Sequence, residues 1–278
     1  MNRSMQSSRE SGETPFVSSF PARWLPSDRE AGVRARMGDA AGLSAFCHPW
    51  DGLEACLRET GAECLSLVGY GSLVNAASAA MTVSSAGGLG PWPVVAFGVR
   101  RVFNYAMDPT HSRYMSSVGP EARALLNVRL SSKIEHALNG ALLEVGLADL
   151  PALRERESDY DLAPVACLNW GGEDREPFIA WILVCSETSE RGKRRVDNGL
   201  LPNHDYYSVC REGAESYGAE FLSAWLDSTF LGNGETLRVF SAREKTFQNL
   251  PERFPRNIFS GKVFTPCPRT IPPPPPHP

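Results

Sequence analysis

The stretch from Ser66 to Asn75 (SLVGYGSLVN) constrains the fold more than any other part of the sequence. Its apolar first half predicts a buried β-strand, and the two glycines that bracket Tyr70 predict a loop directly after it. Glycines allow backbone angles and close approaches that side chains block, so the N–H groups of such a loop are free to face an anion or a carbonyl oxygen. We therefore expect a strand that leads into a ligand-binding loop at Tyr70–Leu73.

Predicted strands outnumber predicted helices in the rest of the chain. Apolar and β-branched runs predict strands at 94–103, 124–130, 137–145, 163–170 and 178–185, and helical spacing predicts helices at 51–60, 76–81, 147–156 and 211–228. Most of these strands follow one another through loops, which favours a closed sheet over a doubly wound one. The predicted fold class is α+β, a closed or nearly closed mixed β-barrel with a few packed helices.

Single residues within these strands carry further expectations. Gly140 marks either a bulge or a close approach of another backbone segment. Arg100 and Arg101 are most simply a solvent-facing edge, although one of them could lie near an acidic ligand.

Composition divides the chain into three parts. Residues 1–60 are rich in Ser, Arg, Gly and Pro, which predicts a partly disordered N-terminal extension with a short helix near 51–60. Residues 61–250 carry the predicted strands and form the main domain. Residues 251–278 form a Pro-rich tail, and its Pro272–Pro276 run is the kind of segment that a proline-binding domain can take as a partner.

Charge, cysteines and histidines exclude several classes of function. A net charge of −4 argues against a nucleic-acid partner or an anionic membrane. The seven cysteines contain no C-x-x-C pair and the five histidines show no H-E-x-x-H spacing, so we predict no metal. The chain has neither the apolar segment of a secretory signal nor a stretch long enough to span a bilayer, which predicts a cytoplasmic protein.

The Tyr70 loop differs from three well-known catalytic loops. Ser72 lacks the flanking glycines of a hydrolase nucleophile elbow, because Tyr70 and Val74 hold those positions. The loop also lacks the Lys-Ser/Thr end of a P-loop and the third glycine of the dinucleotide fingerprint. Nucleotide chemistry and a serine nucleophile are therefore disfavoured.

Three segments, taken in order, resemble the gamma-glutamylcyclotransferase family, including its ChaC-type branch. The first is the YGSL loop at Tyr70–Leu73, and the second is Leu153–Tyr160 (LRERESDY), which is similar to the family's L-D-x-R-E-G-G-Y segment. The third begins at Pro202–Tyr206 (PNHDY) and continues through Gly213 and Gly218. The resemblance spans roughly residues 64–231.

This resemblance implies a reaction and a set of site residues. The family's substrate attacks its own side-chain carbonyl with its α-amino group, which releases 5-oxoproline and an amine without a cofactor. The implied binding partner is the substrate itself, a small gamma-glutamyl molecule such as glutathione or a gamma-glutamyl amino acid or amine. The implied site consists of Glu157 as catalytic acid/base, Tyr70, Gly71, Ser72 and Leu73 as the loop that holds the gamma-glutamyl group, and Tyr160 and Tyr206 as pocket residues.

The sequence departs from the family pattern at two places, and other interpretations stay open. Arg154 stands in place of an Asp, and Ser158-Asp159 replace two glycines beside Glu157, which bears on substrate preference. Glu155 is the alternative acid/base, and both pocket tyrosines also suit a structural role. The alternative functions are a non-catalytic ligand- or protein-binding module on the same fold and a gamma-glutamyl-processing biosynthetic enzyme with a larger amine substrate.

Overall fold

The computed structural model describes residues 24–44, 50, 53, 57, 62–84, 91–108, 121–171 and 176–247, and the statements below concern these residues. The predicted tail at 251–278 and most of the predicted helix at 51–60 lie outside them. The strands are β1 (Cys64–Gly69), β2 (Trp92–Phe97), β3 (Val99–Ala106), β4 (Ala124–Leu130), β5 (Ala137–Gly146), β6 (Asp161–Asn169), β7 (Phe178–Val184) and β8 (Thr229–Leu231). The helices are α1 (Glu30–Ser44), α3 (Ala76–Ala80), α4 (Leu150–Arg156), α5 (Gly192–Arg195), α6 (His204–Ser216), α7 (Ala219–Asp227) and α8 (Leu237–Arg243), with short 3-10 turns η2 (Ser72–Val74) and η3 (Lys245–Phe247).

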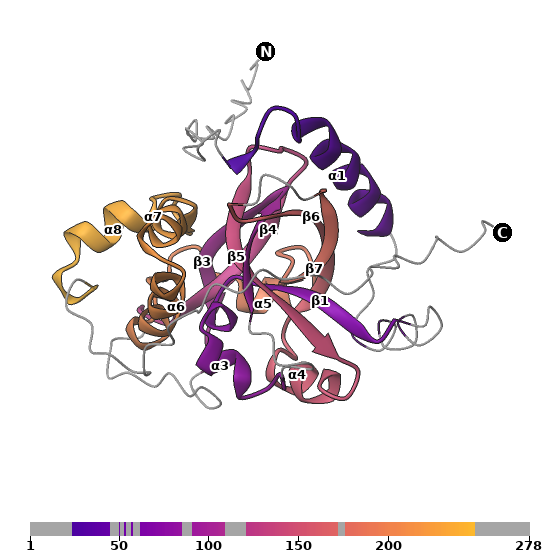
Figure 1. Cartoon of the computed structure of the whole chain (residues 1–278). Helices are drawn as coiled ribbons and strands as arrows, with labels where there is room; N and C mark the ends of the chain where they lie inside the picture. Colours follow the sequence, from indigo (N-terminus) through magenta and orange to yellow (C-terminus); the bar gives the residue numbers. More distant parts are fainter. Residues whose placement is uncertain are drawn as a thin grey trace, which may run out of the picture.

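Five of the described strands close into a barrel in the order β1-β5-β2-β6-β7 (Figure 1). Neighbouring strands are antiparallel except β1 and β7, whose parallel pairing closes the barrel. Helices pack around it, so the prediction of an α+β fold with a closed mixed β-barrel is confirmed.

Strand β2 shows why these strands are apolar at successive positions. Val94 and Ala96 belong to the main core, whereas Val95 and Phe97 belong to a second core beneath α1. Because side chains alternate between the two faces of a strand, both faces of β2 are buried. The sequence did not predict α1, since glycines at three of its fifteen positions weaken the helical signal.

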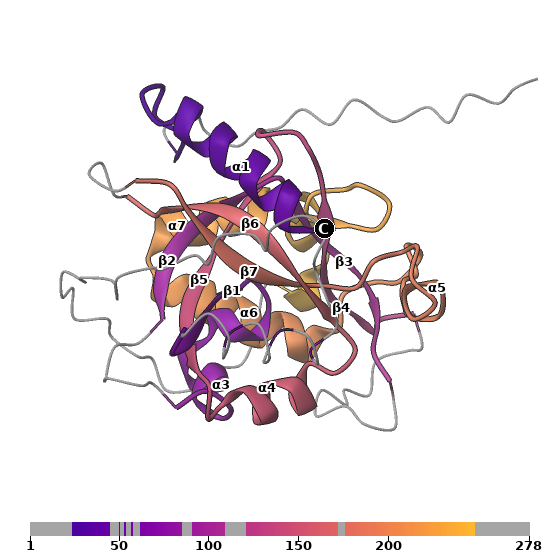
Figure 2. The same ribbon diagram turned by 90° about the vertical axis from the view of Figure 1, so that its right-hand side faces the viewer.

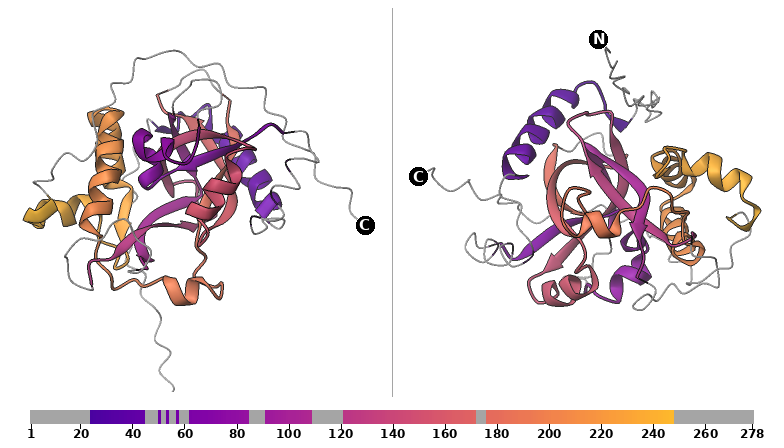
Figure 3. Two further views of the ribbon diagram at one scale, coloured as in Figure 1. Left: turned by 90° about the horizontal axis from the view of Figure 1, so that it is seen from below. Right: turned by 180° about the vertical axis from the view of Figure 1, so that it is seen from behind.

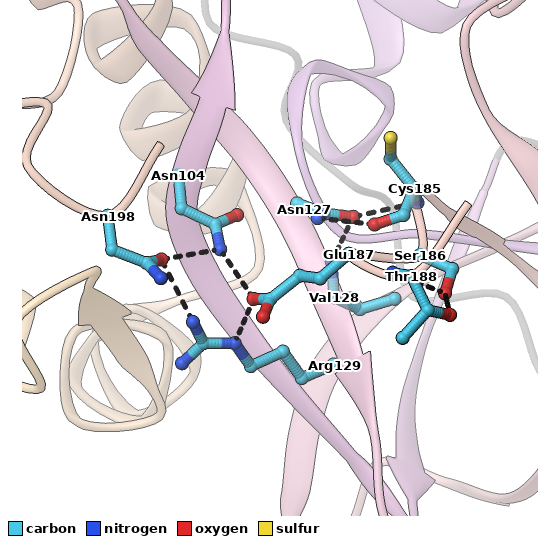
Figure 4. A network of polar contacts seen from close by, with 9 residues as sticks. All are labelled: Asn104, Asn127, Val128, Arg129, Cys185, Ser186, Glu187, Thr188 and Asn198. Atoms are coloured by element: carbon cyan, nitrogen blue, oxygen red, sulfur yellow. Dashed lines mark hydrogen bonds and ion pairs between the residues drawn. The ribbon is translucent and has the colours of Figure 1, made fainter. Parts of the chain in front are cut away.

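Strands β4, β3 and β8 form a second sheet beside the barrel. The Asn127 side chain on β4 donates to the Cys185 carbonyl and accepts the Cys185 N–H, each at 2.9 Å (Figure 4). Nearby, Glu187 accepts hydrogen bonds from Arg129 and Asn104 (Figure 4). These contacts fix the second sheet to the segment that follows β7.

Two predicted elements are each divided by a glycine with a positive φ. The strand predicted at 94–103 is β2 and β3, which belong to different sheets and are separated by Gly98 (φ 73°). The helix predicted at 211–228 is α6 and α7, which are separated at Gly218 (φ 103°). Both single-element predictions are wrong, because a left-handed glycine redirects the chain without interrupting the apolar pattern around it.

Apart from the short α5, the described helices lie in three groups. Helix α1 lies on one side of the barrel and α6, α7 and α8 lie on the opposite side (Figures 1 and 3). Helices α3 and α4 lie together at one end (Figure 2). Within the described residues, no helix has the length and apolar character needed to cross a membrane.

Candidate active site

The predicted ligand-binding loop follows β1 and contains η2. Its first glycine, Gly69, lies against Gly140 of β5, where a Cβ would stand 2.6 Å from the Gly69 carbonyl oxygen. Gly140 therefore permits a close backbone approach, one of its two predicted roles. After the loop, the Asn75 side chain caps α3 by accepting the Ser78 N–H at 3.1 Å. The loop is thus constrained at both ends.

Tyr206 lies directly against this loop. A Cβ at Gly71 would overlap the Tyr206 hydroxyl, so glycine is required for the contact. Tyr206 comes from the first turn of α6, where its N–H donates to the Asn203 side chain at 2.9 Å. The first and third segments of the family resemblance therefore meet here.

Arg156 connects α4 to the loop. Its guanidinium donates to the Ser72 hydroxyl at 3.0 Å and to the Ser78 carbonyl at 2.7 Å, and it also binds the Ser78 and Thr82 hydroxyls. Its Nε lies 3.0 Å from the Glu157 carboxylate. Charge-assisted hydrogen bonds are stronger than neutral ones, so Arg156 holds Glu157 and Ser72 in one cluster.

Glu157 lies where α4 ends, and its side chain is 14% exposed. Its N–H donates to the Leu153 carbonyl and its own carbonyl accepts the Tyr160 N–H, each at 2.9 Å, which fixes the turn into β6. The ion pair with Arg156 thus places a carboxylate, a group that can take part in proton transfer, beside the loop. The alternative acid/base, Glu155, is exposed.

Tyr70, Tyr160 and Tyr206 form a buried cluster beside Glu157. Burial raises the pKa of Tyr70 well above its ordinary value, and the negative charge of Glu157 raises it further. Burial also raises the pKa of Tyr160, with smaller contributions from Tyr70, Tyr206 and Glu157. The structure therefore brings the three predicted tyrosines together with the predicted carboxylate, and the phenols of Tyr70 and Tyr160 stay protonated at neutral pH.

Tyr160 and Leu73 also have structural contacts. The Tyr160 hydroxyl donates to the Leu126 carbonyl at 2.9 Å, and the Tyr160 carbonyl accepts the Trp50 indole N–H at 2.9 Å. Leu73 is buried and belongs to the main core. Tyr160 thus makes structural contacts through both its hydroxyl and its backbone, and Leu73 anchors the loop by packing.

Asp159, one of the departures from the family pattern, has specific partners. Its carboxylate accepts the Tyr105 hydroxyl at 2.5 Å and lies 3.7 Å from Arg195. The Tyr105 ring packs on Tyr160, with ring centroids 4.8 Å apart. Where the family has a glycine, this chain therefore links the turn after Glu157 to β3.

Sequence reasoning missed three neighbours of the site. Arg156 directly precedes Glu157 in the matched segment, so that segment could have revealed it. Arg101 was expected at a solvent-facing edge, and this is wrong, because it is 0% exposed and lies behind the loop. The contact of Trp50 with Tyr160 depends on tertiary packing, and no local pattern marks it.

The described residues include no group of three or more His, Cys, Asp or Glu side chains that could hold a metal ion. The groups that gather at the loop are a carboxylate, an arginine, hydroxyls and backbone amides. Such groups can bind a small polar molecule and transfer a proton.

No protein-family model matches this sequence, and no curated protein is significantly similar to it. Solved structures with a similar fold include YkqA from Bacillus subtilis (15% identity, 60% of this chain and 54% of that chain covered, TM-score 0.40). Two others are a gamma-glutamyl cyclotransferase specific to glutathione from yeast (10% identity, 60% and 95% covered, TM-score 0.39) and a gamma-glutamyl cyclotransferase (12% identity, 59% and 86% covered, TM-score 0.38). The solved structures to which this chain is similar thus include gamma-glutamyl cyclotransferases, at low identity.

Proposed function

We propose that this protein is a gamma-glutamylcyclotransferase-like enzyme that converts glutathione or a related gamma-glutamyl compound into 5-oxoproline and a free amine. The observation that carries the proposal is the Arg156 bridge between the Glu157 carboxylate and Ser72 of the glycine loop. Two segments that are far apart in the sequence thereby supply one cluster, and Tyr206 of the third segment lies against Gly71 of the same loop.

The reaction is an intramolecular acyl transfer. The substrate's α-amino nitrogen loses a proton and attacks the γ-carbonyl carbon, so that a new C–N bond closes a five-membered ring. The bond from that carbon to the amine nitrogen breaks, and the amine leaves with a proton. Water and cofactors are not needed for the balance. Well-oriented intramolecular reactions reach effective molarities on the order of 10⁵ M, so a loop that bends the glutamyl chain supplies much of the acceleration.

Glu157 is the proton carrier in this proposal. As a carboxylate held by Arg156, it accepts the proton from the α-ammonium group and then returns it to the leaving amine. The Ser72 hydroxyl acts as a hydrogen-bonding group and not as a nucleophile, and it already accepts a hydrogen bond from Arg156. Tyr70 and Tyr206 are buried, and in this proposal their side chains line the place where the glutamyl chain bends.

The loop backbone stabilises the reacting carbonyl oxygen. The N–H groups of Gly71 and Ser72 stand at the start of η2, where helical geometry offers them no acceptor within the turn. An oxyanion that binds such a donor is stabilised by about 3 kcal/mol per donor.

Incubation of the purified protein with glutathione and with gamma-glutamylalanine tests this function, with the products identified by mass spectrometry. We expect 5-oxoproline together with cysteinylglycine or alanine. A substrate with an acetylated α-amino group lacks the nucleophile and should give no product. Turnover confined to larger gamma-glutamyl amines would favour the biosynthetic alternative, and no product from a broad panel would favour the binding module.

A further inference from the structure

Arg101 is a fully buried arginine whose assigned hydrogen-bond partners, among the described residues, are all neutral. Its Nε donates to the Thr229 hydroxyl at 2.7 Å, and its Nη1 donates to the Asn139 carbonyl at 2.7 Å. Its Nη2 donates to the Ser228 hydroxyl at 3.0 Å and to the Trp225 carbonyl at 3.2 Å. The guanidinium therefore joins β3 to β5, the end of α7 and β8.

The charge of Arg101 makes its burial costly. Taking an ion out of water costs several kcal/mol, and well-packed apolar side chains often replace a buried ion pair without loss of stability. Burial lowers the pKa of Arg101 to about 9, so the group still carries its charge at neutral pH. The Trp225 ring centroid lies 5.0 Å from the Arg101 Cζ, but no carboxylate pairs with Arg101 among the described residues. A charge retained in a core without an ion-pair partner points to a use for the charge itself.

The same guanidinium also contacts the backbone of the glycine loop. Its Nη1 also donates to the Tyr70 carbonyl at 3.4 Å. That carbonyl and the Gly71 N–H belong to one planar trans peptide, so they point in opposite directions. Arg101 therefore holds the carbonyl side of the Tyr70–Gly71 peptide, and the N–H of the same peptide points away from the guanidinium.

We propose that Arg101 is the positioning residue of the Tyr70–Leu73 loop. It holds the Tyr70 carbonyl on the buried side, which turns the Gly71 N–H to the substrate side, and its charge favours negative charge on the reacting carbonyl oxygen. This assignment rests on the proposed function, because that oxygen belongs to the gamma-glutamyl group. Coulomb attraction is much less screened in a core than in water, so the guanidinium need not touch the substrate to act on it.

Two substitutions and one matched control test the assignment in the full-length protein. Arg101→Met removes the charge and the donors, and Arg101→Lys keeps the charge but loses the guanidinium fork. The control is Arg100→Met on the same strand, where Arg100 is half-buried and hydrogen-bonds the His136 side chain instead. The two readouts are amide hydrogen exchange of the loop at 69–75 and steady-state formation of 5-oxoproline.

We expect Arg101→Met to raise exchange in the loop about fivefold, as the loss of about one hydrogen bond implies. It should lower kcat about 100-fold with little change in KM, as the loss of oxyanion stabilisation does. Arg101→Lys should recover at least a tenth of the wild-type kcat, and Arg100→Met should match the wild type in both readouts. A merely structural role would instead raise exchange throughout β3 and α7, with kcat per folded molecule unchanged, and this pattern overturns the assignment.

The two readouts separate failure of this assignment from failure of the proposed function. Faster loop exchange in Arg101→Met, in a protein whose wild type forms no 5-oxoproline, would reject the enzyme and keep the positioning of the loop. Turnover in the wild type with unchanged loop exchange in Arg101→Met would reject the positioning. If Arg101→Met does not fold, Arg101→Lys and Ser228→Ala, which removes one acceptor of Arg101, take its place. Unchanged loop exchange in both would overturn the assignment.

Discussion

Two arginines hold the glycine loop: Arg156 binds the Ser72 hydroxyl, and Arg101 binds the Tyr70 carbonyl. The two arginines have different surroundings. Arg156 has a side chain that is 8% exposed, and it pairs with the Glu157 carboxylate while binding hydroxyl and carbonyl oxygens. Arg101 is 0% exposed, and its assigned partners among the described residues are neutral. The charge of Arg156 is therefore paired with a carboxylate, whereas Arg101 lies over the Trp225 ring and has no carboxylate partner among the described residues.

Because of this difference, Arg156 and Arg101 suit different roles at the loop. A compensated pair holds a carboxylate in a fixed place and keeps it ionised, which suits a proton acceptor. An uncompensated charge in a core produces a positive potential, which suits a site where negative charge develops on a carbonyl oxygen.

Glu157→Gln should have the largest effect on catalysis. The amide keeps the shape of the side chain but cannot carry the proton, so turnover should fall about 1000-fold, within the usual range for a general base. The free energy of unfolding should also fall, because the amide leaves the largely buried Arg156 without its ion-pair partner, so turnover is compared per folded molecule. The matched control is Glu155→Gln on the exposed surface two residues earlier. Equal losses in the two variants, or full turnover in Glu157→Gln, would remove Glu157 as the proton carrier.

Arg156→Met should have the largest effect on stability. It leaves the largely buried Glu157 carboxylate without its ion-pair partner and removes the bonds to Ser72, Ser78 and Thr82. We expect a loss of about 3 kcal/mol in the free energy of unfolding, measured by urea denaturation. Arg154→Met, at an exposed position of the same helix, is the control and should cost under about 0.5 kcal/mol. A small effect for Arg156→Met would show that the Arg156–Glu157 ion pair does not hold the loop at Ser72.

Gly71→Ala tests the contact between the loop and α6. The added methyl group would overlap the Tyr206 hydroxyl, and overpacking of this kind costs about 2 kcal/mol. Removing the hydroxyl with Tyr206→Phe should relieve part of this cost, so the double variant should be more stable than the sum of the single variants predicts. Strict additivity in a double-mutant cycle would show that the two groups do not meet.

Alkaline pH should destabilise the protein gradually. Burial raises the pKa of Tyr70 and Tyr160 above the ordinary value of 10.0, and raises the pKa of Cys185 from 9.0 to about 11. Above about pH 9 the unfolded chain releases protons that the folded chain keeps, so the contribution of these groups to stability is full below this pH and falls above it. Urea denaturation across this range should show the decline, and a Tyr70→Phe variant should show a shallower one. A steeper decline in that variant would contradict the role of Tyr70.

The sequence predicted those parts of the fold that depend on local pattern. The apolar and β-branched runs indicated the strands, their succession through loops indicated the barrel, and the glycines around Tyr70 indicated the loop. The division at Gly98 and the separation of α6 from α7 at Gly218 were missed, because a positive φ leaves the apolar spacing around a glycine intact.

The candidate site shows the same limit. The family resemblance named Glu157 and the three tyrosines that the structure brings together, and their roles remain predictions. The burial of Arg101 was missed, because it depends on five segments that converge in space, and neighbouring residues in the sequence do not reveal that.

The most direct test of the account is the fate of solvent oxygen when wild-type protein acts on glutathione in water enriched in heavy oxygen. Ring closure by the substrate's own amine involves no water, so the account predicts 5-oxoproline without heavy oxygen and an equal amount of cysteinylglycine. Glutamate that carries one heavy oxygen would mean that water attacks the carbonyl, and it would contradict the claim that this loop and Glu157 promote cyclisation.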